Sequence, residues 1–471
     1  MSGSYTRVRW HQPGLSPLRE ESARLIATAA PIPDDRNALL DILSLVGIPI
    51  VEGADTASQY AVELLKLAAE VEHALMVQYL YAAASLPDDP GRDSVNYHGK
   101  LMDVAIQEMG HLATVQNLLL LVGGREALYM QRDAMRQISD KNPIPFVLEP
   151  ISLPSLAKYV AAEMPAQVPP ELAVKVDELV QLAAQSAGVD THRVGVIYGL
   201  LGWIFTPPGE AEGKVDFAAL APLPNKPHLC DDDLSDASEI AQHEALAEEW
   251  HVFEPEIILL TAHTCAEARQ AIEQIAEQGE GLQNKDASHF GEFMEMVAAF
   301  EANRFVVEPI ATSPTLGAHG GEGGEVISHP YARLWGETFS IQYDLLVLTI
   351  YHALITPRSS DGDAGLRGDL AALALRGMRE VIGPISSLVG SLPLRADGSS
   401  HRAGPPYDLD PSILESSVDH DLRDQHLRLL ERLVSLYAAV AASPEFGTRP
   451  NDSIELANLR MFDKRRRNLF Q

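Results

Sequence analysis

The stretch IQEMGHLATVQNLLLLVGG, residues 106–124, has the apolar pattern of a buried helix, yet its inner face carries two ionisable side chains. Glu108 falls between Ala105 and Leu112, and His111 lies one turn further along the same face. Side chains three residues apart on a helix lie roughly 5–6 Å apart at Cβ, so this pair could bind one ion. Burying even a neutral polar group without a partner costs roughly 2–7 kcal/mol, and this face therefore requires a compensating partner.

A second helix supplies a candidate partner. Between Ala57 and Leu86 the apolar residues recur at three- and four-residue steps, which predicts a long helix with one buried face. Glu72 lies on that buried stripe. We expect this helix to pair antiparallel with a helix over Tyr97–Val122, which the glycines of Gly123–Gly124 end.

Glu72 on one helix, facing Glu108 and His111 on the other, makes half of the carboxylate-bridged dimetal site found inside four-helix bundles. A mixture of carboxylate and imidazole ligands suits iron or manganese. The spacing leaves one alternative open. In that alternative no metal binds, Glu108 pairs with an arginine, and His111 bonds a backbone carbonyl.

The Glu-x-x-His spacing alone is not selective, because it also occurs at Glu70/His73 and at Glu248/His251. Glu70 lies off the stripe that Glu72 occupies, so we expect it to face solvent. Glu248 and His251 share a face with apolar residues and remain competing ligands from a fourth helix.

The rest of the chain also reads as helical, so we predict an all-α fold: a ferritin-like four-helix bundle with an additional C-terminal helical unit. The expected parts are an entry segment over 1–50, the bundle with insertions over 51–305, and the C-terminal helices over 306–471, with the glycine-rich stretch 319–325 as a natural boundary. The first 33 residues read as irregular. Further helical patterns cover 36–46, 156–164, 171–187, 194–205, 235–253, 255–278, 288–304, 331–355, 366–392 and 412–442.

Composition excludes several classes of function. The formal charge of −30 repels phosphate backbones and anionic membranes, so we expect neither nucleic acid nor membrane as a partner. Two cysteines, Cys230 and Cys265, read as ordinary thiols of a reducing compartment. The start lacks the apolar core of a signal peptide, which predicts a cytoplasmic protein. We interpret the basic run Lys464–Arg467 as a solvated chain end.

Five segments carry a resemblance to a known family. EVEHALMVQYLYA (70–82), residues 106–124 and AIEQIAEQGEGLQNKDASHFGEF (271–293) resemble the ferritin-like family of the iminophenyl-pyruvate dimer synthase type. That family includes the imine-coupling enzymes of violacein and rebeccamycin biosynthesis. YARLWGETFSIQYDLLVLTIYHAL (331–354) and the segment 377–409 resemble the C-terminal helical portion of those enzymes.

The resemblance implies a set of site residues. Glu72, Glu108 and His111 correspond to the first metal ligands and take the catalytic role. Glu163 matches a position where the family has Glu before proline. The segment 271–293 implies further ligands, and the full metal set is then Glu72, Glu108, His111, Glu163, Glu277, Glu280 and His289, with Glu277 as the alternative to Glu280. The implied cofactor is a pair of iron ions, with manganese as an alternative.

These observations favour a dimetal oxidoreductase that uses oxygen or peroxide on a small, nitrogen-containing aromatic intermediate of specialised metabolism. Met76, Tyr79 and Leu112 are expected to line a dry substrate pocket, while Tyr79 and Tyr81 serve mainly in core packing. The family's imine-coupling enzymes are longer, so their substrate and any haem are not carried over. The alternatives are an iron-handling or peroxide-disproportionating protein, and a metal-free helical scaffold in a biosynthetic complex. The expected partners are a small-molecule substrate and further copies of this chain in a homo-oligomer.

Overall fold

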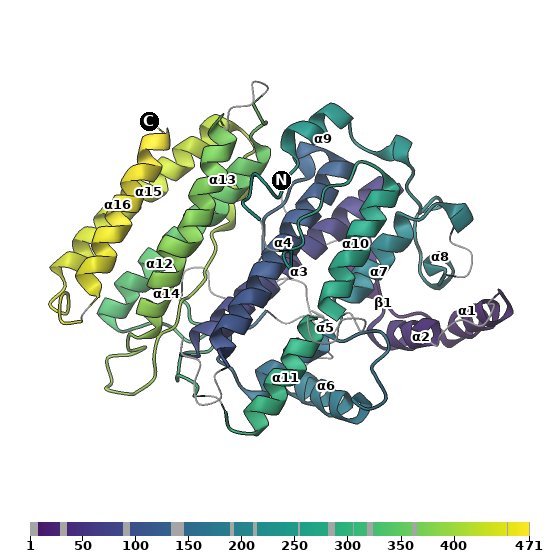
Figure 1. Ribbon diagram of the computed structural model, residues 1–471, viewed down its shortest axis with the longest axis horizontal. Coiled ribbons are helices and arrows are strands. Elements are labelled where there is room, and N and C mark those ends of the chain that lie inside the picture. Colours follow the sequence, from purple (N-terminus) through teal and green to yellow (C-terminus); the bar gives the residue numbers. More distant parts are fainter. Residues whose placement is uncertain are drawn as a thin grey trace.

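The computed structural model describes residues 8–28, 35–87, 95–132, 146–188, 193–210, 214–252, 255–280, 288–304, 306–317, 324–359, 365–449 and 451–470. Within these ranges the chain is almost entirely helical, which confirms the predicted all-α class (Figure 1). The sheet in the described residues is a two-stranded antiparallel pair, in which β1 (Val8–His11) aligns with β2 (Ile48–Val51).

Two long unbroken helices form the centre of the bundle. Helix α3 (Ala57–Ala84) begins where the Thr56 side chain accepts a hydrogen bond from the Gln59 amide. Helix α4 (Tyr97–Gly123) begins with the Asn96 side chain and ends at Gly124, whose φ of 65° suits glycine. Most residues of both helices are buried, so each is covered on more than one side.

The other helices beside this pair are short and interrupted. Helices α5 (Leu153–Glu163) and α6 (Ala173–Ala187) precede α7 (Gly195–Ile204). The backbone amide of Val194 bonds the carbonyl of Ala162 and ties the start of α7 to the end of α5. Helix α10 (Cys265–Glu280) is followed along much the same direction by α11 (His289–Glu301) (Figure 1). Smaller elements are α1 (Leu15–Thr28), α2 (Asp35–Val46), α8 (Phe217–Leu220) and α9 (Ala237–His243), with 3-10 turns at Arg125–Ala127, Pro208–Glu210 and Asp231–Asp233.

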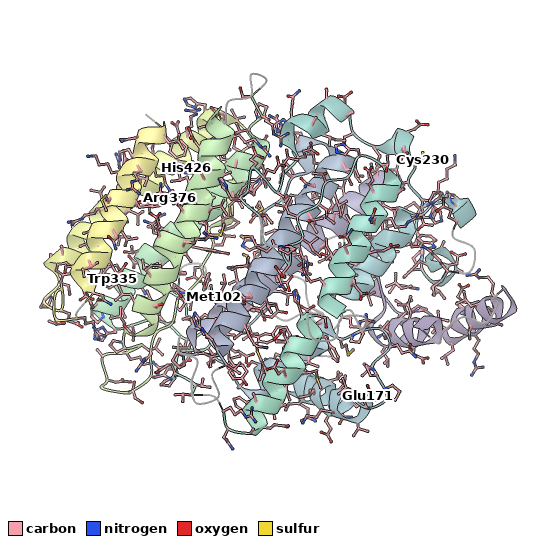
Figure 2. All side chains as sticks on the ribbon, viewed as in Figure 1. Met102, Glu171, Cys230, Trp335, Arg376 and His426 are labelled. Carbon is pink, nitrogen blue, oxygen red and sulfur yellow. The ribbon has the colours of Figure 1, made fainter. Side chains whose placement is uncertain are left out.

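A second group of helices packs beside the bundle. It consists of α12 (Pro330–Ile355), α13 (Gly365–Gly377), a π-helical turn (Met378–Ile382), α14 (Gly383–Gly390), a 3-10 turn (Pro411–Leu414), α15 (Asp419–Ala442) and α16 (Asp452–Phe470). Trp335 of α12 and His426 of α15 are fully buried in this group, whereas Cys230 lies exposed at the opposite side of the molecule (Figure 2). By length and composition α12 is apolar enough to cross a membrane, but 94% of its apolar window is buried inside the protein.

The face of α3 that meets the C-terminal helices corrects one prediction. Glu70 is fully buried rather than solvent-facing, and its carboxylate accepts a hydrogen bond of 2.7 Å from the Tyr129 hydroxyl. His73, on the same face, lies 2.6 Å from the Tyr343 hydroxyl of α12. The prediction was wrong because it assumed that α3 has a single buried face, whereas a second layer of helices covers the other one.

Other predicted helices are shorter than expected because side chains of α4 hold the chain in extended form. The Asn117 amide donates to the carbonyls of Ala245 (2.9 Å) and Leu260 (2.8 Å), and the Leu260 amide donates to the Thr114 hydroxyl. The predicted helix 235–253 therefore ends at His243, and the predicted helix 255–278 begins only at Cys265. Local periodicity does not reveal such long-range hydrogen bonds.

The two ends of the chain also differ from expectation. Residues predicted as irregular contain β1 and α1, because β1 pairs with a distant strand. The predicted helix 366–392 is divided by the π-helical turn, just before Pro384, which has no amide hydrogen to donate. The basic run Lys464–Arg467 lies within α16, and Arg466 is buried instead of solvated. The glycine-rich boundary falls mostly on residues 318–323, outside the described residues, and the division at 305/306 stays a prediction.

Candidate metal centre

Five buried ionisable side chains, which we call the bundle cluster, come together where the long helices meet the interrupted ones. Helix α3 contributes Glu72, and α4 contributes Glu108 and His111. Glu163 is the last residue of α5, and His289 is the first residue of α11. Each of the five is at most 3% exposed. Three members of the cluster thus come from the two unbroken helices, and the ends of two short helices add Glu163 and His289.

The first half of the cluster consists of Glu72, Glu108 and His111, whose ligand atoms all lie within 4.8 Å of one another. The His111 Nδ1 atom is 2.8 Å from Glu108 Oε2 and 3.4 Å from Glu72 Oε2. These three atoms surround one point from two helices. The arrangement can hold one ion.

The second half shares Glu108 with the first. Glu108, Glu163 and His289 also present ligand atoms within 4.8 Å of one another. His289 Nδ1 lies 3.0 Å from Glu108 Oε1 and 3.9 Å from Glu163 Oε2. Because the two oxygens of Glu108 face different halves, its carboxylate lies in the bridging position between two candidate ion sites.

Two glutamines set the orientation of the histidine rings. His111 Nε2 is 2.8 Å from Gln278 Oε1, and His289 Nε2 is 2.9 Å from Gln107 Oε1. The Gln278 amide nitrogen donates to the carbonyl of Glu256 at 2.6 Å, which fixes its oxygen toward His111. Since an amide oxygen can only accept, each Nε2 carries a proton, and each Nδ1 faces the carboxylates. The Nδ1 atom of a protonated His111 ring donates to Glu108, whereas a neutral ring would offer that lone pair to a metal ion.

Two tyrosines hold the outer oxygens of the carboxylates. The Tyr198 hydroxyl of α7 donates to Glu72 Oε1, and the Tyr79 hydroxyl of α3 donates to Glu163 Oε1 at 2.6 Å. Tyr79 therefore does more than pack the core. Tyr81, in contrast, donates to the carbonyl of Ala311 on the opposite side of α3 and serves packing there.

The cluster carries more negative charge than its own histidines can satisfy. Burial, and secondly the charge of Glu108, raise the pKa of Glu72 to about 8. Burial opposes ionisation of Glu108 as well, but His289 and His111 lower its pKa below the ordinary range. Burial opposes the charge on His111, yet hydrogen bonds from its ring to Glu108 and Glu72 raise its pKa well above the ordinary value. Within the described residues, Glu72 Oε2, Glu108 Oε1 and His289 Nδ1 are buried without a hydrogen bond of good geometry, although Glu72 Oε2 lies 3.4 Å from His111 Nδ1 and Glu108 Oε1 lies 3.0 Å from His289 Nδ1.

The space at the cluster is small. A cavity of about 10 Å³ adjoins Glu72, Glu108, His111 and Glu163 and is bounded by Leu75, Val194, Gly195, Tyr198, Ile275, Ala276 and Gly279. This is near the minimum that holds one water-sized particle. Met76, Tyr79 and Leu112 do not line this cavity, whose further walls come from α7 and α10, and their place in a substrate pocket stays a prediction.

Two glycines allow the close packing around this cavity. A Cβ on Gly279 would lie 2.9 Å from Glu163 Oε2, so a larger residue would displace that carboxylate. A Cβ on Gly110, next to His111, would lie 2.6 Å from the carbonyl oxygen of Ile258. Glycine at 110 thus lets the extended chain around Ile258 pack directly against α4.

Three other predicted ligands lie elsewhere. Glu277 is exposed on α10, because the helical period turns Gln278 and Gly279 inward and Glu277 outward. Glu248 and His251 are exposed and take no part in either half of the cluster. Glu280 ends α10, but its side chain lies outside the described residues.

Sequence reasoning missed Gln107, Gln278 and Tyr198. Tyr198 offers a signal in retrospect: it is a lone hydroxyl in the apolar helix GVIYGLLGWI, and a buried tyrosine hydroxyl requires a hydrogen-bond partner. The glutamines carry no such signal, since each is unremarkable among the polar residues beside it.

Comparison with known proteins agrees with this geometry. The family model named Ferritin-like matches residues 65–298. Dichlorochromopyrrolate synthase of Lentzea aerocolonigenes is 24% identical over 424 residues, which cover 78% of this chain and 38% of that protein. The 2-imino-3-(indol-3-yl)propanoate dimerase of Chromobacterium violaceum is 31% identical over 144 residues, which cover 24% of this chain and 14% of that protein.

The chain thus spans well under half the length of the relatives it matches. No solved structure matches it. The resemblance read from segments 70–82, 106–124 and 271–293 is confirmed.

Proposed function

Because the chain contains a ferritin-like domain over residues 65–298, we propose that it is a metal-dependent oxidoreductase whose metal centre is the bundle cluster. Glu72 and His111 would hold one ion, Glu163 and His289 the other, and Glu108 would bridge the two. Carboxylate and imidazole ligands suit iron or manganese, and iron is the ion we propose.

One observation carries this proposal: both histidines donate outward through Nε2, so their Nδ1 atoms and three carboxylates converge on the same buried space. Burying several carboxylates together is costly unless cations compensate them. Two divalent metal ions would satisfy the buried acceptor atoms of Glu72, Glu108 and His289 that lack a well-formed hydrogen bond.

When bound, two such ions would supply one-electron redox chemistry with oxygen or peroxide. The protein's own part is positioning. Tyr198 and Tyr79 fix the rotamers of Glu72 and Glu163 through their outer oxygens, and Gln278 and Gln107 hold the rings of His111 and His289 in one tautomer. Leu75 and Ile275 exclude bulk water, which strengthens every electrostatic contact in the site.

We propose a small nitrogen-containing aromatic molecule as the substrate, because one relative is named for a 2-imino-3-(indol-3-yl)propanoate and both are named as coupling or synthetic enzymes. The cavity of about 10 Å³ is far smaller than the few hundred Å³ that such a molecule occupies. A substrate of this size would therefore reach the centre only at its edge or after side chains around the cavity move.

The experiment is metal loading followed by turnover. Purified protein is reconstituted anaerobically with ferrous iron, and bound iron is counted by elemental analysis beside Glu108→Gln and Glu277→Gln. We expect about two irons per chain in the wild type and in Glu277→Gln, since Glu277 is exposed, and a loss of most iron in Glu108→Gln. Loaded protein is then given 2-imino-3-(indol-3-yl)propanoate and oxygen, with products analysed by mass spectrometry.

Two results would contradict the proposal. Equal iron content in Glu108→Gln and wild type would remove the bridging role, and equal substrate conversion by metal-free and loaded protein would remove the metal from the reaction. Circular dichroism of each variant separates loss of metal from loss of fold.

A further inference from the structure

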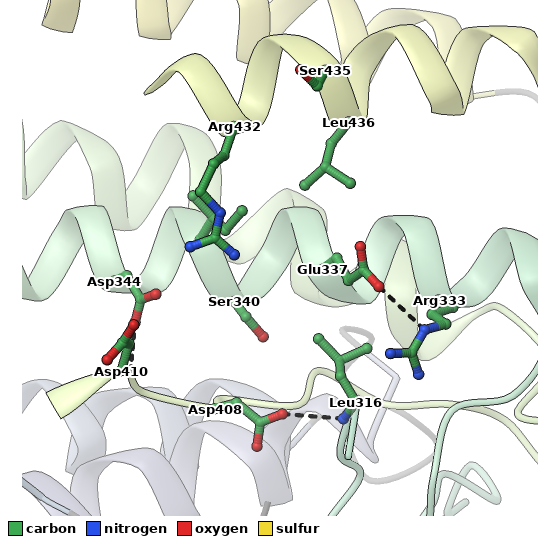
Figure 3. Close-up of a pocket in the computed structure, with 11 residues that line it drawn as sticks. Leu316, Arg333, Glu337, Ser340, Asp344, Asp408, Asp410, Arg432, Ser435 and Leu436 are labelled. Carbon is green, nitrogen blue, oxygen red and sulfur yellow. Dashed lines mark hydrogen bonds and ion pairs between the residues drawn. The ribbon is translucent and has the colours of Figure 1, made fainter. Parts of the chain in front are cut away.

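A second cavity lies among the C-terminal helices, apart from the bundle cluster. It has a volume of about 430 Å³ and is formed by α12, α15 and the chain segments around Leu316 and Asp408–Asp410 (Figure 3). Leu316, Ile341 and Leu436 give it apolar walls. A volume of this order is typical of a small-molecule site.

The charged residues of this cavity are unbalanced. Four carboxylates line it, those of Glu337, Asp344, Asp408 and Asp410, against two guanidinium groups, those of Arg333 and Arg432. Arg333 is already paired with Glu337 at 3.2 Å (Figure 3). At the other carboxylates, burial raises the pKa of Asp344 more than the charges of Arg432 and buried Arg132 lower it.

Two of the aspartates have structural hydrogen bonds that fix their positions. Asp408 Oδ2 accepts from the Leu316 amide at 3.1 Å, and Asp410 Oδ1 accepts from the Ser412 amide at 3.0 Å. Asp344 is 4% exposed, and its Oδ1 accepts the Asp410 amide at 3.0 Å, which brings two carboxylates together at one end of the cavity (Figure 3).

An unused hydroxyl lies beside this pair. Ser340 is 9% exposed, lines the cavity one helical turn from Asp344, and its Oγ has no hydrogen bond in the described part of the chain. Figure 3 shows the Ser340 side chain directed from α12 into the space between Asp344 and Glu337. A buried hydroxyl without a partner is costly, so a bound group with a polar hydrogen would stabilise it.

The carboxylates of this cavity are not arranged as the ligands of a metal ion. Among the described residues, groups of three or more metal-type ligand atoms within 4.8 Å of one another occur around Glu108 only, and no such group includes Asp344. The cavity is also much larger than an ion, and part of its wall is apolar. The geometry instead suits an organic cation that has both a charged group and an apolar body.

We propose that this cavity binds a small organic ammonium ion, whose nitrogen lies against Asp344, Asp410 and Ser340 and whose apolar body lies against Leu316, Ile341 and Leu436. Arg432 lines the same cavity from α15, where its guanidinium can donate to the carboxylate of a ligand that carries one. Burial raises the pKa of Asp344 to about 8, with the charge of Asp410 acting in the same direction. A bound cation would relieve this unfavourable charge. The inference does not depend on the metal centre.

The test uses three probes of matched size: phenethylammonium (cation), L-phenylalanine (zwitterion) and phenylacetate (anion). Binding to the full chain is measured by calorimetric titration in mildly alkaline buffer, where Asp344 is ionised and the amine is still charged. We expect phenethylammonium to bind and phenylacetate not to bind. Asp344→Asn keeps the acceptor for the Asp410 amide but removes the charge, and should weaken phenethylammonium binding by about tenfold or more.

Matched variants make the result decisive. Asp369→Asn removes an exposed charge on α13 and should leave binding unchanged. Ser340→Leu fills the cavity without altering charge and should abolish binding, which keeps the test valid if Asp344→Asn does not fold. Tighter binding of L-phenylalanine than of phenethylammonium, lost in Arg432→Ala, would support the proposal and add a carboxylate contact. Binding of phenylacetate alone, or equal phenethylammonium binding by wild type, Asp344→Asn and Ser340→Leu, would overturn it.

Discussion

The protein contains two buried clusters of polar side chains that are built in opposite ways. The bundle cluster collects three carboxylates and two imidazoles and leaves buried acceptors of Glu72, Glu108 and His289 without well-formed hydrogen bonds in the described residues. A second cluster, which we call the C-terminal cluster, consists of Gln342, Tyr437, Asp463 and Arg466 at the junction of α12, α15 and α16.

Within the described residues every acceptor of the C-terminal cluster has a hydrogen bond, although the Arg466 Nε atom has none. Arg466 donates to Gln342 Oε1 at 3.0 Å and to Asp463 Oδ1 at 3.3 Å. The Gln342 amide donates to both oxygens of Asp463 and to the Tyr437 hydroxyl, and that hydroxyl donates to Asp463 Oδ2 at 2.5 Å. One carboxylate meets one guanidinium, so the charges cancel. The comparison teaches that burial alone does not mark a functional site, whereas burial with unbalanced charge and unused acceptors does.

The largest expected effect is in the C-terminal cluster. Asp463→Ala leaves Arg466 buried without its counter-charge and should lower the free energy of unfolding by about 3–5 kcal/mol. Urea denaturation of the metal-free protein measures this. Asp369→Ala, an exposed position on α13, should change the stability by less than about 0.5 kcal/mol. Equal, small effects of both changes would mean that the C-terminal cluster does not stabilise the fold.

The second prediction asks whether the bundle cluster, unlike the other, depends on a ligand for stability. Ferrous iron at ten times its dissociation constant for each of two sites should stabilise the wild type by about 2.8 kcal/mol in total, because it binds only the folded chain. Glu108→Gln should lose this gain, whereas Asp463→Asn should keep it from a lower baseline. Thermal unfolding under anaerobic conditions provides the measurement. A gain that survives in Glu108→Gln would place the iron elsewhere.

The third prediction concerns the tyrosine that orients Glu72. Tyr198→Phe removes a hydrogen bond to that carboxylate and should weaken iron binding by about 10- to 100-fold, with the fold intact. Tyr159→Phe is the matched control, since Tyr159 is also buried but its hydroxyl makes a long hydrogen bond, of 3.5 Å, to the Gln78 carbonyl. Competition with a chelator gives both affinities. Equal affinities in the two variants would show that Tyr198 has no positioning role.

The smallest effect is a pH dependence that belongs to the C-terminal helices. Burial lowers the pKa of His426 well below its ordinary value. The His352 ring stacks on it, with the ring centroids 5.5 Å apart, and burial lowers the pKa of His352 as well. The groups facing them are Asp419, Arg423 and Arg466. Below about pH 6.5 the unfolded chain takes up protons that the folded chain does not, so stability is present above that pH and is lost as the pH falls.

His426→Leu removes a group that binds a proton only in the unfolded chain, and should flatten this slope by roughly 1 kcal/mol per pH unit. Leucine loses no hydrogen bond here, since neither ring nitrogen of His426 has one in the described residues. His420→Gln is the control, since its side chain is 80% exposed. Unfolding midpoints measured across the acidic range compare the two. An unchanged slope in His426→Leu would assign the acid sensitivity to other groups.

The half of the bundle cluster on the two long helices could be predicted from sequence, and the other half could not. Glu72, Glu108 and His111 lie within unbroken helices, where the phase of the apolar stripe shows which side chains face inward. Glu163 and His289 lie at the ends of short helices, where one turn gives no reliable phase, and only the family resemblance pointed to them. Glu277 was also named from the family resemblance, although the helical period of α10 turns it outward.

The fold shows a similar division. Helices α3, α4 and α12 could be predicted nearly to the residue because their patterns are long. Arg466 was misread because its partners, Gln342 and Asp463, come from two helices, and a run of basic residues looks solvated when those partners are not visible. Likewise, extended chain held by Asn117 replaces predicted helix, since hydrogen bonds across more than a hundred residues leave no local pattern.

Helix α3 presents Glu72 to the bundle and Glu70 and His73 to the opposite side, where His73 meets Tyr343 of α12. A recombinant protein that combines the bundle of one chain with the C-terminal helices of another is therefore expected to fold poorly. A recombinant that kept residues 65–298 and discarded the rest would open a charged face of its central helix to water. Exchange of either half would succeed only with a partner half that supplies a matching hydroxyl, so the two parts are expected to be inherited together.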